Sequence, residues 1–376
     1  MSNLDAVIPT VYEAMDVVSR ELTGFIPAVS RDSNAQRAAK GQTISSHVVP
    51  PVTLEDITPG EAPNNSGDTN LDKVEMSISK ARAAPVKWTG EEQQGVSQSG
   101  QLQAVQRDRF AQSMRALVNE MERDIATEYI RASRAYGTAG STPFSSDITE
   151  IAELHKILAD NGAPQDGESH LVFDTAAGAN LRSQDKLTDV NRAGTEDTLR
   201  RGELGRIYNM ALRESAGIRN HSAGSASSVT VDGAHDEGAT EISVSVGDSL
   251  SLNAGDVIDF GGDNLYVVAE ATSDSPVRIR EPGLMAPLEG GESLSVKSNF
   301  AANLAFHRSA LHLVTRAPAM PEGGDDADDV TEVTDPVTGL AFQVALYRQY
   351  RQVKYEVGLA WGWRAVKPEH MALLMG

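Results

Sequence analysis

The strongest hydrophobic pattern lies close to the end of the chain. From Gln352 to Arg364 apolar and polar residues alternate, so one face of an extended segment carries all its large apolar side chains. Two of the three tryptophans of the chain lie on that face. We therefore predict a long β-strand that is docked into a core. Its apolar face comprises Val353, Tyr355, Val357, Leu359, Trp361 and Trp363.

A second alternating region lies near the N-terminus. A short helical pattern over residues 1–23 is followed by a small, polar, aperiodic arm that reaches residue 42. Residues 43–58 and 71–88 then alternate on either side of a turn-rich segment, which predicts a long hairpin. Two strands that project alone are marginally stable in water, so the hairpin needs a covering domain or a neighbouring molecule.

Residues 93–136 contain no proline and carry apolar residues near every third and fourth position. This spacing predicts one amphipathic helix that ends at Gly137. A helix of roughly 35–40 residues would be about 55 Å long, which is unusual in a compact globule. We interpret its charged face as solvated, with a two-chain coiled coil as the alternative. That face comprises Arg107, Asp108, Arg115, Glu122, Arg123, Glu128 and Arg131.

The middle of the chain mixes helical and strand patterns and then becomes β-rich. We expect a helix over 148–159, a buried strand over 169–173 and a helix over 176–181, with mixed elements over 197–213. From about residue 222 to 298 short strands are separated by turn residues, which is typical of a small barrel or sandwich. The expected strands cover 228–231, 241–246, 256–260, 264–268, 277–279 and 293–296.

After this β-rich module the chain returns to the mixed helix and strand patterns seen before it. Residues 299–308 show a mixed pattern and residues 310–315 a strand, so the module is expected to be an insertion into a host domain. Residues 322–335 contain four aspartates within five positions and no basic residue, which predicts an exposed loop. A weak cation site or a contact between subunits are the alternatives for this loop, although it lacks the spacing of an EF-hand.

Composition excludes several kinds of chemistry. The 376-residue chain has no cysteine and a formal net charge of -20, which opposes thiolate chemistry and broad binding to phosphate backbones or anionic lipid. No nucleotide-binding loop, zinc-hydrolase motif or nucleophile elbow occurs in the sequence. His307 and His312 are five residues apart and cannot share a metal, and Asp256 is interpreted as a turn residue. We expect no enzyme, no catalytic, cofactor-binding or metal-ligating residue, and no cofactor.

Membrane association is not predicted either. The first residues lack a basic region followed by an apolar one, and no uninterrupted apolar stretch is long enough to span a bilayer. We expect a chain that is made and used in water.

Several segments, in order along nearly the whole chain, resemble one protein family. Residues 107–142 resemble the long helix and exit turn of the major capsid (coat) proteins of short-tailed bacteriophages of the Salmonella-phage coat type. Other segments that resemble this family are 161–164 (Asn-Gly-Ala-Pro), 170–182 (His-Leu-Val-Phe-Asp-Thr-Ala-Ala-Gly-Ala-Asn-Leu-Arg), 214–218 (Glu-Ser-Ala-Gly-Ile), 254–258 (Ala-Gly-Asp-Val-Ile) and 306–316 (Phe-His-Arg-Ser-Ala-Leu-His-Leu-Val-Thr-Arg).

The resemblance implies an α+β fold, the tailed-phage capsid fold that herpesviruses and encapsulins share. This fold has an N-terminal arm, an extended loop, a spine helix, and peripheral and axial domains, and this branch adds an inserted all-β barrel. The implied division is 1–42 N-terminal arm, 43–90 extended loop hairpin, 91–140 peripheral domain with spine helix, 141–221 first part of the axial domain, 222–298 inserted β-barrel domain, 299–340 second part of the axial domain with the acidic loop, and 341–376 peripheral C-terminal strand.

The function that the resemblance implies is structural. A major capsid protein self-assembles into an icosahedral shell that encloses viral double-stranded DNA, with the hairpin lying over a neighbour and the acidic loop near the symmetry axes. The implied partners are further copies in pentamers and hexamers, a scaffolding protein, a portal protein, and packaged DNA without sequence-specific contact. The resemblance leaves open whether a decoration protein also binds. The implied location is the virion, assembled in the cytoplasm of a bacterial host.

Two other functions remain open from the sequence. One is an encapsulin-like bacterial compartment that holds enzymes, which the residues alone do not separate from a phage shell. The other is an acidic hydrolase with a carbohydrate-binding β-module. The sequence argues against the hydrolase, because it offers no pairing of a nucleophile with a base.

Overall fold

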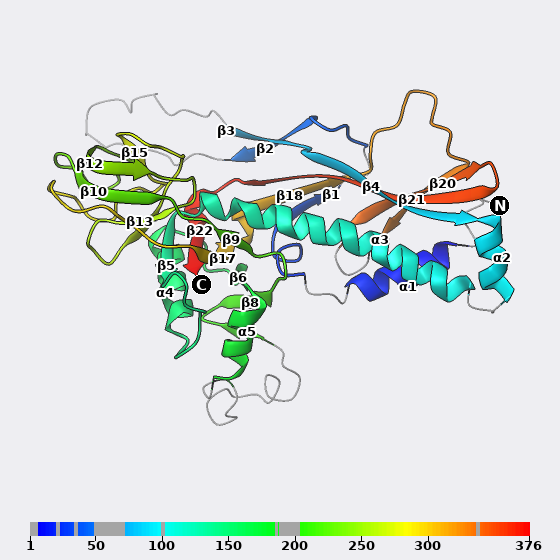
Figure 1. Cartoon of the computed structure of the whole chain (residues 1–376), viewed down its shortest axis with the longest axis horizontal. Coiled ribbons are helices and arrows are strands. Elements are labelled where there is room, and N and C mark those ends of the chain that lie inside the picture. The colour runs from blue at the N-terminus through cyan, green and yellow to red at the C-terminus, as the bar shows by residue number, and fades with distance from the viewer. Residues whose placement is uncertain are drawn as a thin grey trace, which may run out of the picture.

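The computed structural model is a mixed α+β fold built on two main β-sheets, one of six strands and one of ten. In Figure 1 the six-stranded sheet lies above the long helix α3 and helix α1 lies below it, while the ten-stranded sheet gathers at the end of α3 where the C-terminus lies. The structure describes residues 7–19, 23–33, 37–48, 72–98, 102–184, 187, 204–335 and 339–376.

The predicted C-terminal strand is confirmed as β21 (Gln352–Ala365), the longest strand of the six-stranded sheet. It pairs with β4 along one edge and with β20 and then β18 along the other. The order of this sheet is β1 (Ser30–Ser33), β18 (Leu311–Arg316), β21, β20 (Ala341–Gln349) and β19 (Asp329–Thr334), with β4 (Lys80–Thr89) beside β21.

Both faces of β21 are buried, whereas the sequence predicted a single buried face. Tyr355, Leu359 and Trp361 pack into the large core that they share with α3. On the other face Ala360 lies in a small apolar cluster with Met76. A side chain at Gly362 would collide with the backbone oxygen of Ser77, because an added Cβ would lie 2.2 Å away. The small residues of this face therefore leave room for the chain that crosses it.

The helical region is shorter and more divided than predicted. Helix α2 (Gly90–Gln98) and helix α3 (Leu102–Ile125) are followed by a 3-10 turn, η1 (Ala126–Arg131). At 1.5 Å per residue the 24 residues of α3 span about 36 Å. The predicted helix was wrong beyond η1, because Arg134–Gly137 form strand β5 and run parallel to the last strand of the chain.

Helix α3 is held between the sheet and α1 (Ile8–Ser19). Its buried face contacts β4 and β21, and the Phe110 ring meets the Tyr355 ring edge-on with centroids 5.4 Å apart. Burying a large apolar side chain stabilises a fold by about 1.5–3 kcal/mol, so this stripe is a main source of stability. The buried residues of α3 include Phe110, Met114, Leu117, Val118, Met121 and Ile125.

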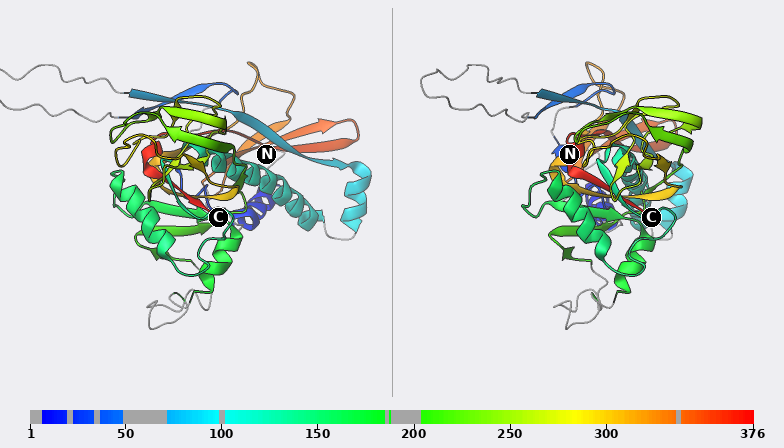
Figure 2. Two further views of the ribbon diagram at one scale, coloured as in Figure 1. Left: turned by 60° about the vertical axis from the view of Figure 1, so that its left-hand side comes forward. Right: turned by 90° about the vertical axis from the view of Figure 1, so that its left-hand side faces the viewer.

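The first part of the predicted hairpin is present as strands β2 (Thr43–Val48) and β3 (Asp72–Ser77), which pair antiparallel with Thr43 opposite Ser77. Residues 49–71, which include the rest of the predicted hairpin, lie outside the described residues. In both views of Figure 2 these two strands lie along the outside of the body.

The predicted strand over residues 71–88 is divided in two. The chain bends after Ser77, and the Ser79 N–H donates to the Trp361 carbonyl before β4 joins the six-stranded sheet. The alternation continues through this bend, since Ile78 and Trp88 are both 1% exposed. Because apolar and polar residues alternate on both sides of the bend, the alternation did not reveal where the chain passes from one sheet to the other.

The ten-stranded sheet contains the last strand of the chain, β22 (Met371–Met375), which the sequence did not predict. Residues 299–308, expected to be mixed, form its long neighbour β17. The order is β16 (Ser295–Val296), β13 (Val257–Asp259), β14 (Leu265–Val267), β5, β22, β17 (Phe300–His307), β6 (Ser169–Phe173), β8 (Met210–Glu214) and β7 (Arg206–Ile207), with β9 (Arg219–His221) beside β17.

Two helices cover this sheet and share a second apolar core with it. The predicted helix over 148–159 and the buried strand over 169–173 are confirmed as α4 (Thr149–Asp160) and β6. The predicted helix from residue 176 is confirmed as α5 (Thr175–Arg182), whose first turn is capped by Asp174 through the Ala177 N–H. Of the mixed elements expected over 197–213, residues 197–203 lie outside the described residues.

The β-rich segment folds around apolar residues of its own. Strands β10 (Ser225–Val231) and β12 (Val244–Ser251) pair with each other, as do β11 (Glu241–Ile242) and β15 (Val277–Arg278). Strands β13, β14 and β16 instead extend the ten-stranded sheet, because β14 pairs with β5. The segment is therefore joined to its host through backbone hydrogen bonds.

The acidic segment is only partly a loop. Residues 322–328 lack regular strands or helices, but Asp329–Thr334 form β19 and pair with β20. The expectation of a loop through Asp335 was therefore wrong for its second half, and Asp335 is 4% exposed. Val333 is 1% exposed, so this strand places an apolar side chain in the core despite its acidic neighbours. No described helix is both long and apolar enough to cross a membrane.

We predict that Trp361→Asp prevents folding. The Trp361 side chain is 0% exposed and its Nε1 donates to Asp124 Oδ2 at 3.0 Å, so the substitution places an unpaired carboxylate beside another buried carboxylate. An uncompensated buried charge costs about 3–5 kcal/mol, a large part of the stability of an ordinary domain. Urea denaturation followed by circular dichroism measures the loss.

The matched control is Trp361→Phe, which keeps an aromatic ring in the core and adds no charge, while it removes the donor to Asp124 and part of the volume of the indole. A buried acceptor without its partner costs about 1–3 kcal/mol, so this variant should fold with reduced stability. A wild-type unfolding curve for Trp361→Asp would show that β21 is not the core strand described above.

Candidate functional site

No residue was predicted to be catalytic, cofactor-binding or metal-ligating, so the polar groups that the fold brings together decide whether a site exists. Among the described residues, no three His, Asp or Glu side chains are grouped to hold a metal. His307 and His312 lie in different sheets, at the end of β17 and in β18.

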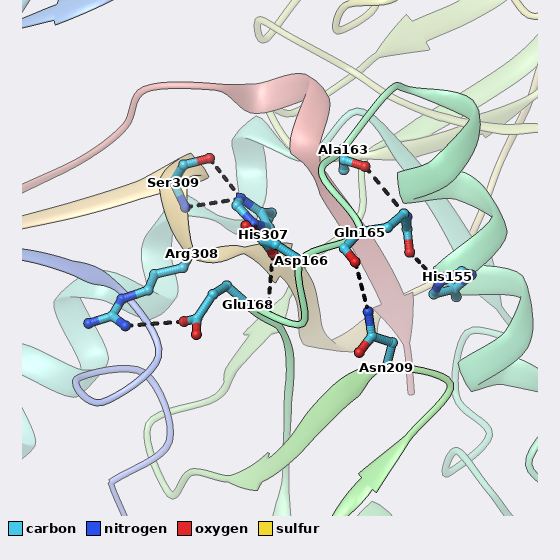
Figure 3. Close-up of polar contacts among 9 residues, drawn as sticks. All are labelled: His155, Ala163, Gln165, Asp166, Glu168, Asn209, His307, Arg308 and Ser309. Atoms are coloured by element: carbon cyan, nitrogen blue, oxygen red, sulfur yellow. Dashed lines mark hydrogen bonds and ion pairs between the residues drawn. The ribbon is translucent and has the colours of Figure 1, made fainter.

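One cluster contains a Ser-His-Asp series that the sequence did not reveal. His307 Nε2 lies 3.0 Å from Asp166 Oδ1, and His307 Nδ1 lies 2.8 Å from Ser309 Oγ (Figure 3). The same Nδ1 accepts the Ser309 backbone N–H at 3.3 Å, so it acts as the cap of the 3-10 turn η2 (Arg308–Ala310). The residues come from β17, η2 and the loop before β6, which explains why spacing along the chain gave no signal.

The geometry of this series fits a structural tie. In a catalytic triad the carboxylate is buried and holds the histidine from behind. Here the Asp166 side chain is 52% exposed and the histidine is buried, which reverses that arrangement. Ser309 bonds to His307 through both its N–H and its hydroxyl, a local contact two residues away that needs no nucleophile. We assign the three residues to holding the turn η2 against the loop before β6.

The same loop is fixed from several directions, as Figure 3 shows. Arg308 Nη1 lies 3.1 Å from Glu168 Oε2, and His155 Nε2 on α4 lies 2.8 Å from Gln165 Oε1. Asn209, in the turn between β7 and β8, donates to the Gln165 carbonyl at 3.4 Å. These contacts join α4, η2 and two strand connections, so they rigidify one end of the ten-stranded sheet.

Glu122 was expected on the solvated face of the long helix and is instead 2% exposed. Its carboxylate accepts the backbone N–H groups of Phe25 and Ile26, at 3.1 and 2.8 Å, and the Ser215 hydroxyl at 2.8 Å. Burial raises the pKa of Glu122, and these hydrogen bonds oppose the shift. Glu122 therefore anchors the start of the arm to α3. Glu122 is four residues after Val118 and three before Ile125, and this spacing along the sequence already places it on the apolar face of the helix.

Asp256 was interpreted as a turn residue, and it does close the turn from Asn253 through its backbone N–H. The sequence did not show that its side chain is also 0% exposed. Its Oδ1 lies 2.6 Å from His221 Nε2, and its Oδ2 accepts the Asn253 N–H at 2.7 Å. His221 Nδ1 in turn lies 2.8 Å from the Tyr129 hydroxyl of η1, and burial raises the pKa of that tyrosine. This chain of hydrogen bonds fastens the β-rich segment to the end of the long helix.

The exposed acidic segment makes contacts with the six-stranded sheet. The Tyr347 hydroxyl donates to Asp325 Oδ2 at 2.8 Å, and burial together with that carboxylate raises the pKa of Tyr347 to about 12. Asp328 lies 3.7 Å from Arg348. These pairs place the acidic segment beside the β20–β21 hairpin.

Comparisons with known proteins were made at the level of sequence and of structure. No protein-family model matches the sequence, and no curated protein matches it. Among solved structures, the fold is similar to one titled Mycobacterium phage Che8, with 14% identity, a TM-score of 0.47, and 90% of this chain and 88% of that chain covered. It is also similar to the capsid structure of the cyanophage P-SCSP1u, with 11% identity, a TM-score of 0.49, and coverage of 95% and 88%.

A third similar structure is the virus-like particle from Pyrococcus furiosus, with 9% identity, a TM-score of 0.42, and coverage of 98% and 99%. Identities and scores of this size do not decide a function. The function must be inferred from the residues and contacts of this chain.

We predict that acid weakens the fold through two buried histidines. Burial, aided by Arg213 for His170 and by Lys367 for His370, lowers the pKa of each imidazole from 6.5 to about 4. Between these values the two imidazoles bind more protons in the unfolded chain than in the folded chain, so the stability that they contribute falls as the pH falls from about 6.5 to about 4. The raised pKa of buried Glu122 and Glu128 acts in the opposite direction, so the contribution is read from variants. Urea denaturation across this range measures the slope.

The double variant His170→Asn, His370→Asn should unfold with a visibly smaller slope against pH, whatever its absolute stability. His155→Asn, at the histidine that contacts Gln165 on the surface of α4, serves as the matched control and should leave the slope unchanged. Equal slopes in the double variant and the parent would contradict the assignment to these two imidazoles.

Proposed function

We propose that this chain is the major capsid protein of a tailed double-stranded DNA bacteriophage, and that many copies assemble into an icosahedral shell around the genome. The observation that carries the proposal is the order of the elements. An arm, a two-stranded projection, a long helix, two sheets and a β-rich segment between β9 and β17 follow one another as the sequence resemblance implies. Assembly is the mechanism, and no catalytic step is needed.

The projecting strands β2 and β3 give this proposal a physical basis. Among the described residues they form a sheet of two strands, and β3 reaches the rest of the fold near β21. Isolated pairs of strands are marginally stable in water. A neighbouring copy that covers them would stabilise them, and a contact repeated in every subunit adds to the stability of a closed shell.

We extend the proposal to the domains. The β-rich segment 222–298 is an inserted domain, because its apolar core is drawn from its own strands and because His221 and Phe300, at its two ends, are paired between β9 and β17. The spine helix and six-stranded sheet correspond to the peripheral domain, and the ten-stranded sheet with α4 and α5 to the axial domain. On this division the acidic segment and β19 belong to the peripheral domain, since β19 pairs with β20.

The remaining partners follow from the same function. A scaffolding protein guides assembly, a portal occupies one vertex, and a decoration protein is compatible with the fold. The net charge of -20 supports a wall that holds DNA without sequence-specific contact. The protein belongs in the virion, after assembly in the cytoplasm of its bacterial host.

We predict that the excised segment 222–298 folds on its own. Its core includes Val231, Ile242, Leu252 and Val277, each at most 3% exposed in the whole chain. Circular dichroism should show β-structure and a cooperative thermal transition. A disordered fragment would show that the segment depends on β5 and on Tyr129, and would refute the inserted domain while leaving the shell function untouched.

We predict that deleting residues 59–68, in the turn-rich segment outside the described residues, leaves a folded subunit that no longer forms shells. The parent, with a scaffolding protein if it needs one, should sediment as megadalton particles. The deletion should sediment slowly and melt at the parent temperature, because the deleted residues are proposed to contact a neighbour. Normal shells from the deletion, or an unfolded subunit, would contradict the role proposed for the hairpin.

A further inference from the structure

The far end of the six-stranded sheet exposes a tyrosine. Tyr350 is 90% exposed and lies with Arg351 in the two-residue turn between β20 and β21, where Gln349 pairs with Gln352. Arg351 has a φ of 53°, so the turn has a fixed left-handed geometry. Tyrosine and arginine are enriched in protein interfaces, because each adds a large contact surface with polar atoms at its end.

A groove of about 330 Å³ lies beside this turn. Its walls include Trp88 and Val353, and they also include Arg348 and Arg351. The Gly90 N–H at the start of α2 donates to the Arg351 carbonyl at 3.2 Å, which closes one end of the groove. Trp88 is 1% exposed, and its indole N–H has no acceptor among the described residues. We call this groove with Tyr350 the tip groove.

The tip groove is basic in an acidic protein. The Arg109 guanidinium lies 4.5 Å from the centre of the Trp88 ring, and Arg348 and Arg351 are exposed on the other side. The carboxylates near it are Glu91 and Glu92 at the start of α2, where Glu92 accepts the Thr89 N–H, and Asp328, which lies 3.7 Å from Arg348. The exposed Arg351 beside the apolar wall fits an acidic peptide segment.

The chain carries such a segment at the same end of the molecule. Glu322, Asp325, Asp326 and Asp328 are exposed, and the contacts of Asp325 with Tyr347 and of Asp328 with Arg348 hold the segment near the β20–β21 hairpin (Figure 1). If the tip grooves of two copies met, the arginines of one copy would face the arginines of the other and repel them. An acidic segment on a tip groove pairs opposite charges instead, so electrostatics favours the second arrangement.

We propose that the acidic segment 322–328 of one copy docks on the tip groove of a second copy. Its carboxylates approach Arg351, since Arg348 is already paired with Asp328 of its own copy, while Tyr350 packs against the segment. Because both surfaces lie at one end of the subunit, the contact is exchanged reciprocally between two copies or passed around a closed ring. The inference rests on the proposed shell function and adds the residues through which subunits meet at this end.

The absence of cysteine allows a direct test. Two single-cysteine variants, Pro321→Cys beside the acidic segment and Gln349→Cys in the wall of the groove, keep every charge of the proposed contact. They are assembled separately and as a mixture, treated with a short bismaleimide cross-linker, and separated on a denaturing gel. The mixture should give a cross-linked dimer that contains one copy of each variant. Each variant alone should give little dimer. Thermal melts of both variants should match the cysteine-free parent, because both side chains are exposed.

A matched control places the second cysteine elsewhere. Tyr208 is 52% exposed in the turn between β7 and β8 of the other sheet, so Tyr208→Cys mixed with Pro321→Cys should give no more dimer than either alone. Dimer from Gln349→Cys alone would show tip-to-tip contact, and dimer from Pro321→Cys alone would show loop-to-loop contact. Either result overturns the proposal.

The outcome also separates this inference from the shell function. Particles that form normally but give no mixed dimer overturn the docking contact and leave the shell intact. A cysteine-free parent that forms no particles under any condition overturns the shell function and this contact with it. A fivefold or greater excess of mixed dimer over the Tyr208→Cys control, in assembled particles, is the result that we expect.

Discussion

The constraint on which the rest of the structure depends is the burial of β21 on both faces. One face carries large side chains into the core around α3, and Trp361 reaches Asp124 on that helix. The other face carries Ala360 and two glycines, against which the chain leading into β4 packs. Strands β4, β20 and β18 all pair with β21. This single strand therefore fixes the helix, the sheet and the base of the hairpin relative to one another.

The buried polar groups act at the junctions between these parts. Glu122 holds the start of the arm on α3, and Asp256 holds the β-rich segment on η1 through His221. A buried carboxylate without partners is costly, so each of these groups fixes one arrangement of the elements that it joins. The subunit therefore has a rigid body, while the features proposed to meet neighbours, the β2–β3 pair and the tip groove, lie at its margins.

The sequence predicted the elements whose periodicity was local. The alternation around Trp361, the helical stripe through Met114 and the buried strand before Asp174 were all found in the structure. It did not predict β22, because Met371–Met375 is a short apolar run with no alternation and its role depends on β17 and β5. The bend after Ser77 and the strand β5 were missed for the same reason, since distant pairing partners decide them.

Site prediction failed where residues meet only after folding. Asp166, His307 and Ser309 are brought together from separate elements, and Asp256 is bonded to His221 as well as to its own turn. We assign structural roles to these polar clusters, so contacts between subunits remain the place where the proposed function is carried out. Charge then becomes informative, because a basic groove and an acidic segment lie at one end of a strongly acidic chain.

The measurement that tests the central claim most directly is electron microscopy of the purified protein, produced alone and together with a scaffolding protein if it needs one. The account predicts closed, hollow particles of uniform diameter with icosahedral symmetry, built from copies of this chain. A population of monomers or dimers under every condition, with a folded subunit by circular dichroism, would contradict it.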